Sequence, residues 1–127
     1  MKLLEDLVDN SKTDKNREHS YLPLYQRFFT PLQSSAKNIL EIGIGSWTKK
    51  QKYENGGSVK LWYDFFDNAN VYAIDIIPKK RVSDELFHID RIHIFTEQDA
   101  YDYRFVKYTC IDTGIKFDVL IDDGPHT

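Results

Sequence analysis

The segment NILEIGIG (residues 38–45) determines how the rest of this sequence is interpreted. An apolar run leads into an acidic residue and then into two glycines separated by one residue, Gly43 and Gly45. This pattern is typical of a buried parallel strand whose carboxyl end holds a ligand. The glycines permit a sharp turn and a close approach of the backbone to a bound group, which a Cβ would obstruct. We therefore expect a strand at residues 38–42 and a ligand site directly after it.

The composition excludes several classes of protein. With 127 residues, 41% of them hydrophobic, the chain is expected to form a single globular domain at most. A net charge of −3 with scattered Lys and Arg residues disfavours nucleic acid as the main partner. The lone Cys110 excludes an intrachain disulfide framework, and no apolar run approaches the roughly 20 residues that span a bilayer. We expect a soluble cytoplasmic protein without a membrane partner.

Apolar runs alternate with helical patterns along the rest of the chain. An apolar run in each expected strand and helices between strands are typical of a parallel α/β sheet. The expected strands are residues 38–42, 71–76, 91–95 and 116–121, and the expected helices are residues 1–10, 21–32, 59–66 and 100–112.

Four local features predict how these elements pack. Leu24, Phe28 and Leu32 form one helical stripe that would face the sheet. Ser58 is a plausible N-cap for the helix that follows Gly56 and Gly57. The tyrosines and phenylalanines of residues 100–112 are expected to pack the helix rather than to stack on bases. Residues 119–121 are apolar at every position, which favours a strand buried on both faces.

Each expected strand ends in polar and mostly acidic residues. Ligands of open α/β sheets bind outside the carboxyl ends of the strands, so these residues are the candidate site. They are Glu41, Gly43 and Gly45 after the first strand, Asp75 after the second, Gln98 and Asp99 after the third, and Asp122 and Asp123 after the fourth.

Asp75 and Glu41 suggest which ligand the site would bind. An acidic residue that ends the second strand can accept both hydroxyls of a ribose, although a loop or helix-capping Asp is the alternative. A dinucleotide fingerprint would place a third glycine where Thr48 stands. Glu41 would repel a pyrophosphate but suits an amino-acid ammonium group. The charges favour S-adenosylmethionine (SAM) over NAD.

Several motifs together resemble the class I SAM-dependent methyltransferases. They are EIGIG at residues 41–45, GGSVKLW at 56–62, VYAIDI at 71–76 and FDVLIDDGPH at 117–126. More narrowly, the chain is similar to the macrocin-type O-methyltransferases, which act on macrolide and aminocoumarin sugars. That group shares an N-terminal D-K-x-x-x-H-x-Y segment, here Asp14, Lys15, His19 and Tyr21, and an insertion after the first glycines.

The resemblance implies a Rossmann-like sheet of order 3-2-1-4 and a role for each strand end. Glu41, Gly43 and Gly45 would line the amino-acid end of SAM, with Ser58 beside them. Asp75 would hold the ribose, and Gln98 and Asp99 would flank the adenine. Asp123 would be a Mg²⁺ ligand, with His126 as general base and Asp122 beside it in the catalytic set. Mg²⁺ can orient and acidify a hydroxyl, and a His titrates near neutral pH. Pro125 stands where many relatives have Ser.

The resemblance also predicts an incomplete enzyme. Residues 1–35 would form an N-terminal helical or lid segment and residues 36–127 the SAM-binding half of a catalytic domain, because this fold normally continues with three more strands. In a 3-2-1-4 order the fourth strand would be an exposed apolar edge. A missing C-terminal half, or a second copy in a homo-oligomer, would then pair with it.

Three functions remain open at this point. The first is a SAM-dependent O-methyltransferase acting on a hydroxyl of a sugar or other small molecule. The second is a truncated or catalytically inactive domain that keeps the methyltransferase fold for binding or assembly. The third is an NAD-dependent oxidoreductase, which Glu41 disfavours.

Overall fold

The computed structural model describes residues 2–8, 22–44 and 55–122. Predictions for residues 9–21, 45–54 and 123–127 lie outside this part of the chain. They include the N-terminal Asp14–Tyr21 motif, Gly45, Asp123 and His126.

The described strands form one parallel sheet. The strands are β1 (Asn38–Ile42), β2 (Asn70–Ile74), β3 (Ile92–Phe95) and β4 (Val119–Asp122), and they lie in the order β3-β2-β1-β4. In the register, Leu40 of β1 lies opposite Tyr72 of β2 on one side and Leu120 of β4 on the other. The sheet order, its parallel sense and the position of β1 confirm the sequence predictions.

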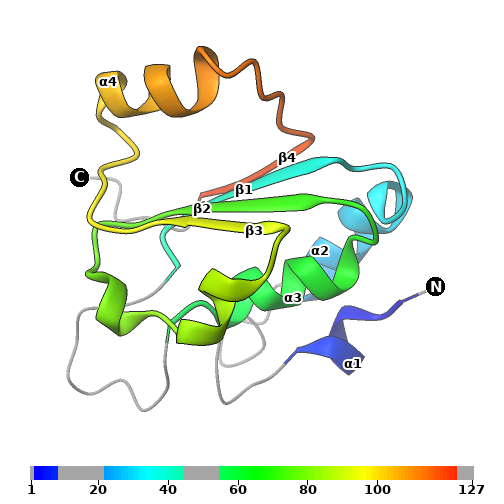
Figure 1. The fold of residues 1–127 in the computed structure, drawn as a ribbon. Helices are drawn as coiled ribbons and strands as arrows, with labels where there is room; N and C mark the ends of the chain where they lie inside the picture. The colour runs from blue at the N-terminus through cyan, green and yellow to red at the C-terminus, as the bar shows by residue number, and fades with distance from the viewer. Residues whose placement is uncertain (1, 9–21, 45–54, 123–127) are drawn as a thin grey trace.

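Helices cover both faces of the sheet, giving three layers (Figure 1). One face carries α1 (Leu4–Leu7), α2 (Leu22–Phe29) and α3 (Gly57–Phe65). The other face carries α4 (Tyr103–Val106), which continues as a π-helical turn, η4 (Lys107–Ile111). Short 3₁₀ turns complete the described chain: η1 (Thr30–Leu32), η2 (Lys79–Arg81) and η3 (Asp84–His88). None of the described helices is long and apolar enough to cross a membrane.

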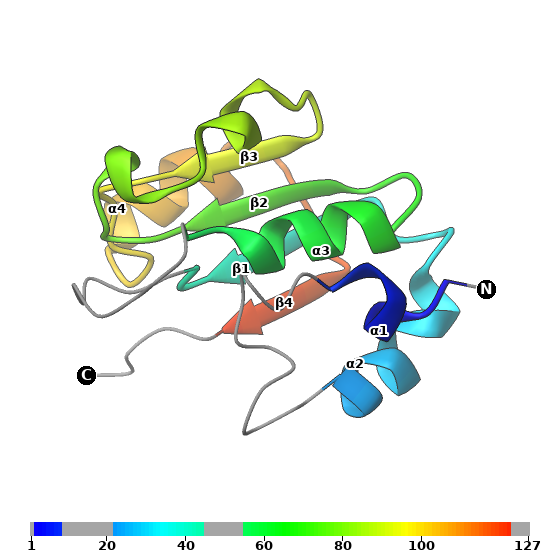
Figure 2. The same ribbon diagram turned by 90° about the horizontal axis from the view of Figure 1, so that it is seen from below.

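The main core lies between the sheet and α3, the helix that Figure 2 shows along the sheet with α1 and α2 at its side. Strand residues alternate between faces, so Ile39 and Val71 share the α3 face and are fully buried. Trp62 of α3 is also fully buried and meets the rings of Tyr25 and Phe29 edge-on, with centroids 5.3 and 5.4 Å away. Two segments far apart in the sequence therefore share one aromatic cluster.

The predicted apolar stripe was wrong for Leu24 and Phe28 of α2, although Leu32 of η1 does pack against the core. Leu24 and Phe28 are 50% and 60% exposed, whereas Leu22 and Phe29 are buried. The apolar residues of LPLYQRFF occupy one broad arc of the helix, and only the part of that arc with Leu22 and Phe29 is buried. The face that carries Tyr25 and Phe29 packs inward because it meets Trp62 of α3.

The start of α3 also differs from the prediction. The residue that caps the helix is Gly56, not Ser58, which lies inside the first turn. Gly56 has φ of 105°, and an added Cβ there would lie 2.5 Å from the side chain of Leu86. A glycine is needed at this position both for its left-handed backbone and for the close packing against η3.

The α4 face is more open than the sequence suggested. β4 is buried through Val119 and Ile121, but Leu120 is 61% exposed, so the strand is covered on one face only. Tyr103 and Tyr108 are exposed, contrary to the predicted packing role, whereas the ring of Phe105 meets that of Phe95 in β3, with centroids 5.7 Å apart. This face of the sheet is thinly covered.

Asp118 fixes the beginning of β4 against β1. Its carboxylate accepts hydrogen bonds from the backbone N–H groups of Lys37 and Asn38, at 2.7 and 3.1 Å. These donors favour the charged form and lower the pKa of Asp118 below its usual value. The edge strand is therefore held at its amino end by charge-assisted hydrogen bonds, while its carboxyl end reaches the candidate site.

Candidate functional site

The turn after β1 is built around Gly43 and Ile44. Gly43 has φ of 82°, a conformation that favours glycine, and its N–H donates to the carbonyl of Ile74 at 3.0 Å. The N–H of Ile44 donates to Asp75 Oδ2 at 2.6 Å, and the Ile44 carbonyl accepts from Gly56 N–H at 3.3 Å. The turn is thus tied to the end of β2 and to the start of α3.

Asp75 follows β2 directly and is the residue that organises this turn. It is only 8% exposed, and its second carboxylate oxygen accepts the N–H of Ile77 at 3.1 Å. Both oxygens therefore stabilise backbone, as in the loop role that the sequence left open. Each carboxylate oxygen can accept more than one hydrogen bond, so further donors such as ribose hydroxyls remain chemically compatible.

Glu41 and Ser58 meet between the sheet and α3. Glu41 is completely buried, and the hydroxyl of Ser58 donates to its Oε1 at 2.8 Å. A buried carboxylate is costly unless it is hydrogen-bonded, so this contact contributes to holding the start of α3 on the end of β1. The structure thus brings together two of the predicted site residues through a direct contact.

The loop after β3 is anchored on the end of β2. The Asp75 N–H donates to the Phe95 carbonyl at 3.0 Å, and the Gln98 N–H donates to the Asp75 carbonyl at 3.1 Å. Between them Glu97 has φ of 56°, a left-handed conformation that is uncommon for a residue other than glycine. Gln98 and Asp99 are exposed and lie in this constrained loop, next to the end of β2.

Asp122, the last residue of β4, makes a contact that the sequence did not predict. The hydroxyl of Tyr101 lies 3.3 and 3.4 Å from its two carboxylate oxygens. The sequence predicts a packing role for Tyr101, and its position in the sequence carries no signal for this contact. Only the path of the loop between β3 and α4 brings it to the end of β4.

The described residues contain no group of three or more His, Cys, Asp or Glu side chains that could hold a metal ion. Asp122 is the described residue nearest in sequence to the predicted metal ligand Asp123, which lies outside the described part together with His126. The predicted metal role of Asp123 and the predicted base role of His126 therefore stay predictions.

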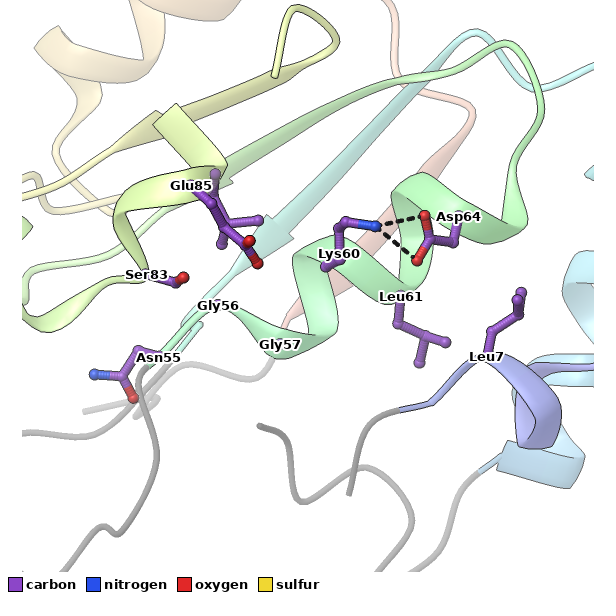
Figure 3. Close-up of a pocket in the computed structure, with 10 residues that line it drawn as sticks. Leu7, Asn55, Gly56, Gly57, Lys60, Leu61, Asp64, Ser83 and Glu85 are labelled. Atoms are coloured by element: carbon purple, nitrogen blue, oxygen red, sulfur yellow. Dashed lines mark hydrogen bonds and ion pairs between the residues drawn. The ribbon is translucent and has the colours of Figure 1, made fainter. Parts of the chain in front are cut away.

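A separate pocket of about 350 Å³ lies along the outer side of α3. Figure 3 shows its lining, with Gly57 and Lys60 of α3 on one side, Glu85 of η3 on another and Leu7 of α1 nearby. The Lys60 ammonium is already paired with the Asp64 carboxylate at 2.8 Å. None of the predicted site residues that the structure describes lines this pocket, so we place the candidate site at the strand ends instead.

The fold of the chain, with its sheet order, is that of a known methyltransferase. The fold matches MycE, a methyltransferase of mycinamycin biosynthesis solved with Mg, S-adenosylhomocysteine (SAH) and mycinamycin VI, with a TM-score of 0.77 and 31% identity. The match covers 98% of this chain and 32% of MycE. The chain thus has the SAM-methyltransferase fold over the part that it shares with MycE.

Sequence comparison gives the same result. The chain is 34% identical over 109 residues to 8-demethyl-8-(2-methoxy-alpha-L-rhamnosyl)-tetracenomycin-C 3'-O-methyltransferase of Streptomyces olivaceus, and equally so to mycinamicin VI 2''-O-methyltransferase of Micromonospora griseorubida. It is 31% identical to demethylmacrocin O-methyltransferase of Streptomyces fradiae. The predicted resemblance to macrocin-type sugar O-methyltransferases is confirmed.

The extent of these matches is asymmetric. Each covers 85% of this chain but only 25% of the relative, so the chain spans about a quarter of the length of these curated proteins. No protein-family model matches the chain.

Proposed function

We propose that this protein takes part in SAM-dependent O-methylation of a hydroxyl on a small molecule, of which a sugar is the favoured class. The observation that supports this most strongly is the match to MycE over 98% of the chain, since MycE was solved with SAH, the product form of SAM. The polar strand ends lie at the edge where ligands of such sheets bind.

The chain's own residues fit the parts of SAM in different ways. Gly43 provides a turn without a Cβ beside the end of β1, where the amino-acid end would lie. The buried charge of Glu41 favours a nearby ammonium group, and Ser58 holds that carboxylate in place. Asp75 has lone pairs left for ribose hydroxyls, and the exposed side chains of Gln98 and Asp99 are available to flank an adenine.

The hydroxyl that accepts the methyl group would bind near the end of β4. In our proposal Asp123 binds Mg²⁺, which would orient and acidify the acceptor hydroxyl. His126 would remove its proton, and Asp122 would belong to the same set. Methyl transfer itself requires mainly that the hydroxyl oxygen be aligned with the sulfonium, so catalysis would come largely from positioning.

Three further points belong to this proposal. Residues 1–35 would act as the N-terminal helical or lid segment and residues 36–127 as the cofactor-binding half. The open edge of β4 would pair with further strands or with a second copy of the chain. The acceptor would be a small molecule rather than a nucleic acid, and the protein would work in the cytoplasm.

Calorimetric titration with SAH tests the cofactor part. We expect one site per chain and a loss of affinity of about tenfold or more in Asp75→Ala, because two ribose hydrogen bonds would be removed. Asp75 also holds Ile44, so a thermal melt must show that this variant folds. Gln98→Ala, at an exposed position, serves as the second variant and should weaken SAH binding by a few fold.

The matched control is Asp84→Ala, an exposed acidic position in η3. It should bind SAH as the unchanged chain does. NADH binding in place of SAH would favour the oxidoreductase instead. A folded chain that binds neither ligand would disprove the proposal.

A further inference from the structure

Tyr101 and Asp122 come from opposite edges of the sheet. Tyr101 follows β3 and Asp122 ends β4, with β2 and β1 between these strands. Neighbouring strands are about 4.8 Å apart, so the ends of β3 and β4 are separated by about 14 Å. A contact between the two side chains requires the loop after β3 to run along the carboxyl edge of the sheet.

The loop has the hydrogen bonds that direct it along this edge. It is first fixed on β2, where the Asp75 carbonyl accepts the Gln98 N–H at 3.1 Å. It then turns at Asp99, whose side chain accepts the Tyr101 N–H at 2.8 Å and whose carbonyl accepts the Asp102 N–H at 3.0 Å. Tyr101 lies two residues before α4 in the sequence, and the segment between β3 and α4 leads to the face of the sheet that α4 covers (Figure 1).

Asp122 faces the same side. In the register it lies opposite Ile42, two residues after the Leu120–Leu40 pair, so its side chain points to the α4 face. Asp75 lies one residue beyond Ile74, whose side chain is on the α4 face, so the alternation directs Asp75 toward the α3 face, where it bonds Ile44. A ligand at Gly43 would have Asp75 on one side and the Tyr101–Asp122 contact on the other.

The Tyr101 hydroxyl is placed almost equally between the two oxygens of Asp122, at 3.3 and 3.4 Å. These distances are longer than the usual 2.5–2.7 Å of a hydroxyl bound to a carboxylate, so the contact can tighten or open without breaking any strand. It joins the loop that would hold adenine to the strand end that would serve the acceptor.

We propose that Tyr101 is a positioning residue of this site: its hydroxyl orients the Asp122 carboxylate and connects the adenine-side loop to the end of β4, which slows release of the bound cofactor. The inference rests on the proposed SAM site and adds a residue to it. Tyr101 acts through Asp122, not by contact with the reacting atoms.

The test is the rate of SAH release, measured by stopped-flow displacement on the full chain. Tyr101→Phe removes only the hydroxyl and should speed release about three- to tenfold, the effect of losing one hydrogen bond. Tyr103→Phe is the matched control, since Tyr103 is exposed in the first turn of α4, and it should release SAH at the original rate. A purely structural role would instead lower the melting temperature, which Tyr101→Phe should leave unchanged.

Substitution of Asp122 separates an indirect role from direct contact with the cofactor. Asp122→Asn keeps an acceptor oxygen for Tyr101 and should retain most of the slow release, whereas Asp122→Ala should release SAH as fast as Tyr101→Phe. In the Asp122→Ala background, Tyr101→Phe should add nothing. Two results would overturn this inference without affecting the proposed function. The first is SAH release at the original rate in Tyr101→Phe. The second is that Tyr101→Phe speeds release by its full factor even when Asp122 is already alanine. No SAH binding by the unchanged chain would overturn the proposed function and this inference with it.

Discussion

The same strands contribute apolar side chains to both faces of the sheet, but the two faces are packed very differently. On the α3 face, Ile39 and Val71 are fully buried in the same core cluster as Trp62, and α1 and α2 lie beside α3 (Figure 2). On the α4 face, Tyr72 and His93 stack on each other while still partly exposed, and Leu120 is largely exposed. The described chain thus has one complete hydrophobic layer and one thin layer.

This difference suggests a division between stability and function. The α3 face supplies most of the buried apolar surface and therefore most of the folding free energy. The carboxyl ends of the strands depend instead on hydrogen bonds to single side chains such as Asp75 and Glu41. Substitutions should accordingly cause large losses of stability on the α3 face, moderate changes at the strand ends and small changes on the α4 face.

The largest effect is expected for Trp62→Ala. Removal of this fully buried ring leaves a cavity next to Tyr25 and Phe29 and should cost about 3–5 kcal/mol of unfolding free energy. Urea denaturation measures this. Because such a loss can prevent folding altogether, Ile39→Val on the same face is the milder variant, with an expected cost of about 0.5–1.5 kcal/mol. Unchanged stability in both would contradict the assignment of the main core to this face.

The next effect is expected for Ser58→Ala. The change removes the hydroxyl that donates to the buried Glu41 carboxylate and should cost about 1–3 kcal/mol, the penalty for a buried polar group that loses a partner. Ser35→Ala, at an exposed position, is the control and should stay within about 0.5 kcal/mol. Equal denaturation midpoints for the two variants would show that the Ser58–Glu41 contact contributes little.

The sequence located all four strands, although β2 is Asn70–Ile74 rather than residues 71–76 and β4 is Val119–Asp122 rather than residues 116–121. It did not determine which helix faces are buried. β1 begins and ends as predicted because its apolar run is bounded by a polar residue and by Gly43. The stripe through Leu24 and Phe28 was wrong because the apolar arc of α2 is wider than the face that is buried, and the contact with Trp62 selects the part that carries Phe29. The 3-2-1-4 order came from the resemblance to known enzymes, since local patterns do not encode strand order.

The candidate site could be predicted only in part for a related reason. Strand ends are local features, so Glu41, Asp75 and Asp122 could be placed at one edge from the sequence. The Ser58–Glu41 and Tyr101–Asp122 contacts join residues 17 and 21 positions apart, and they depend on loop paths that no local pattern fixes.

A smaller effect is expected at Glu97, where the loop after β3 has a left-handed backbone. Glycine adopts this conformation without a Cβ penalty, but it also increases the conformational entropy of the unfolded chain. With both effects included, Glu97→Gly should raise the unfolding free energy by about 0.5–1 kcal/mol. Glu97→Val should lower it by about 1 kcal/mol or more, because a β-branched residue is poorly tolerated there. Urea denaturation of the pair gives the sign directly, and a stabilising valine would exclude backbone strain at this position.

The smallest effect is expected at Leu120, which tests how open the α4 face is. Leu120→Gln replaces an exposed apolar side chain of the edge strand with a polar one of similar size, so the stability of the isolated chain should change by less than about 0.5 kcal/mol. Ile121→Gln, at the adjacent buried position, is the matched control and should be severely destabilising. If Leu120→Gln lowers the unfolding free energy as much as Ile121→Gln does, Leu120 must be covered in solution. Light scattering at several protein concentrations would then show whether a second copy covers it, because an oligomer of the unchanged chain should dissociate in this variant.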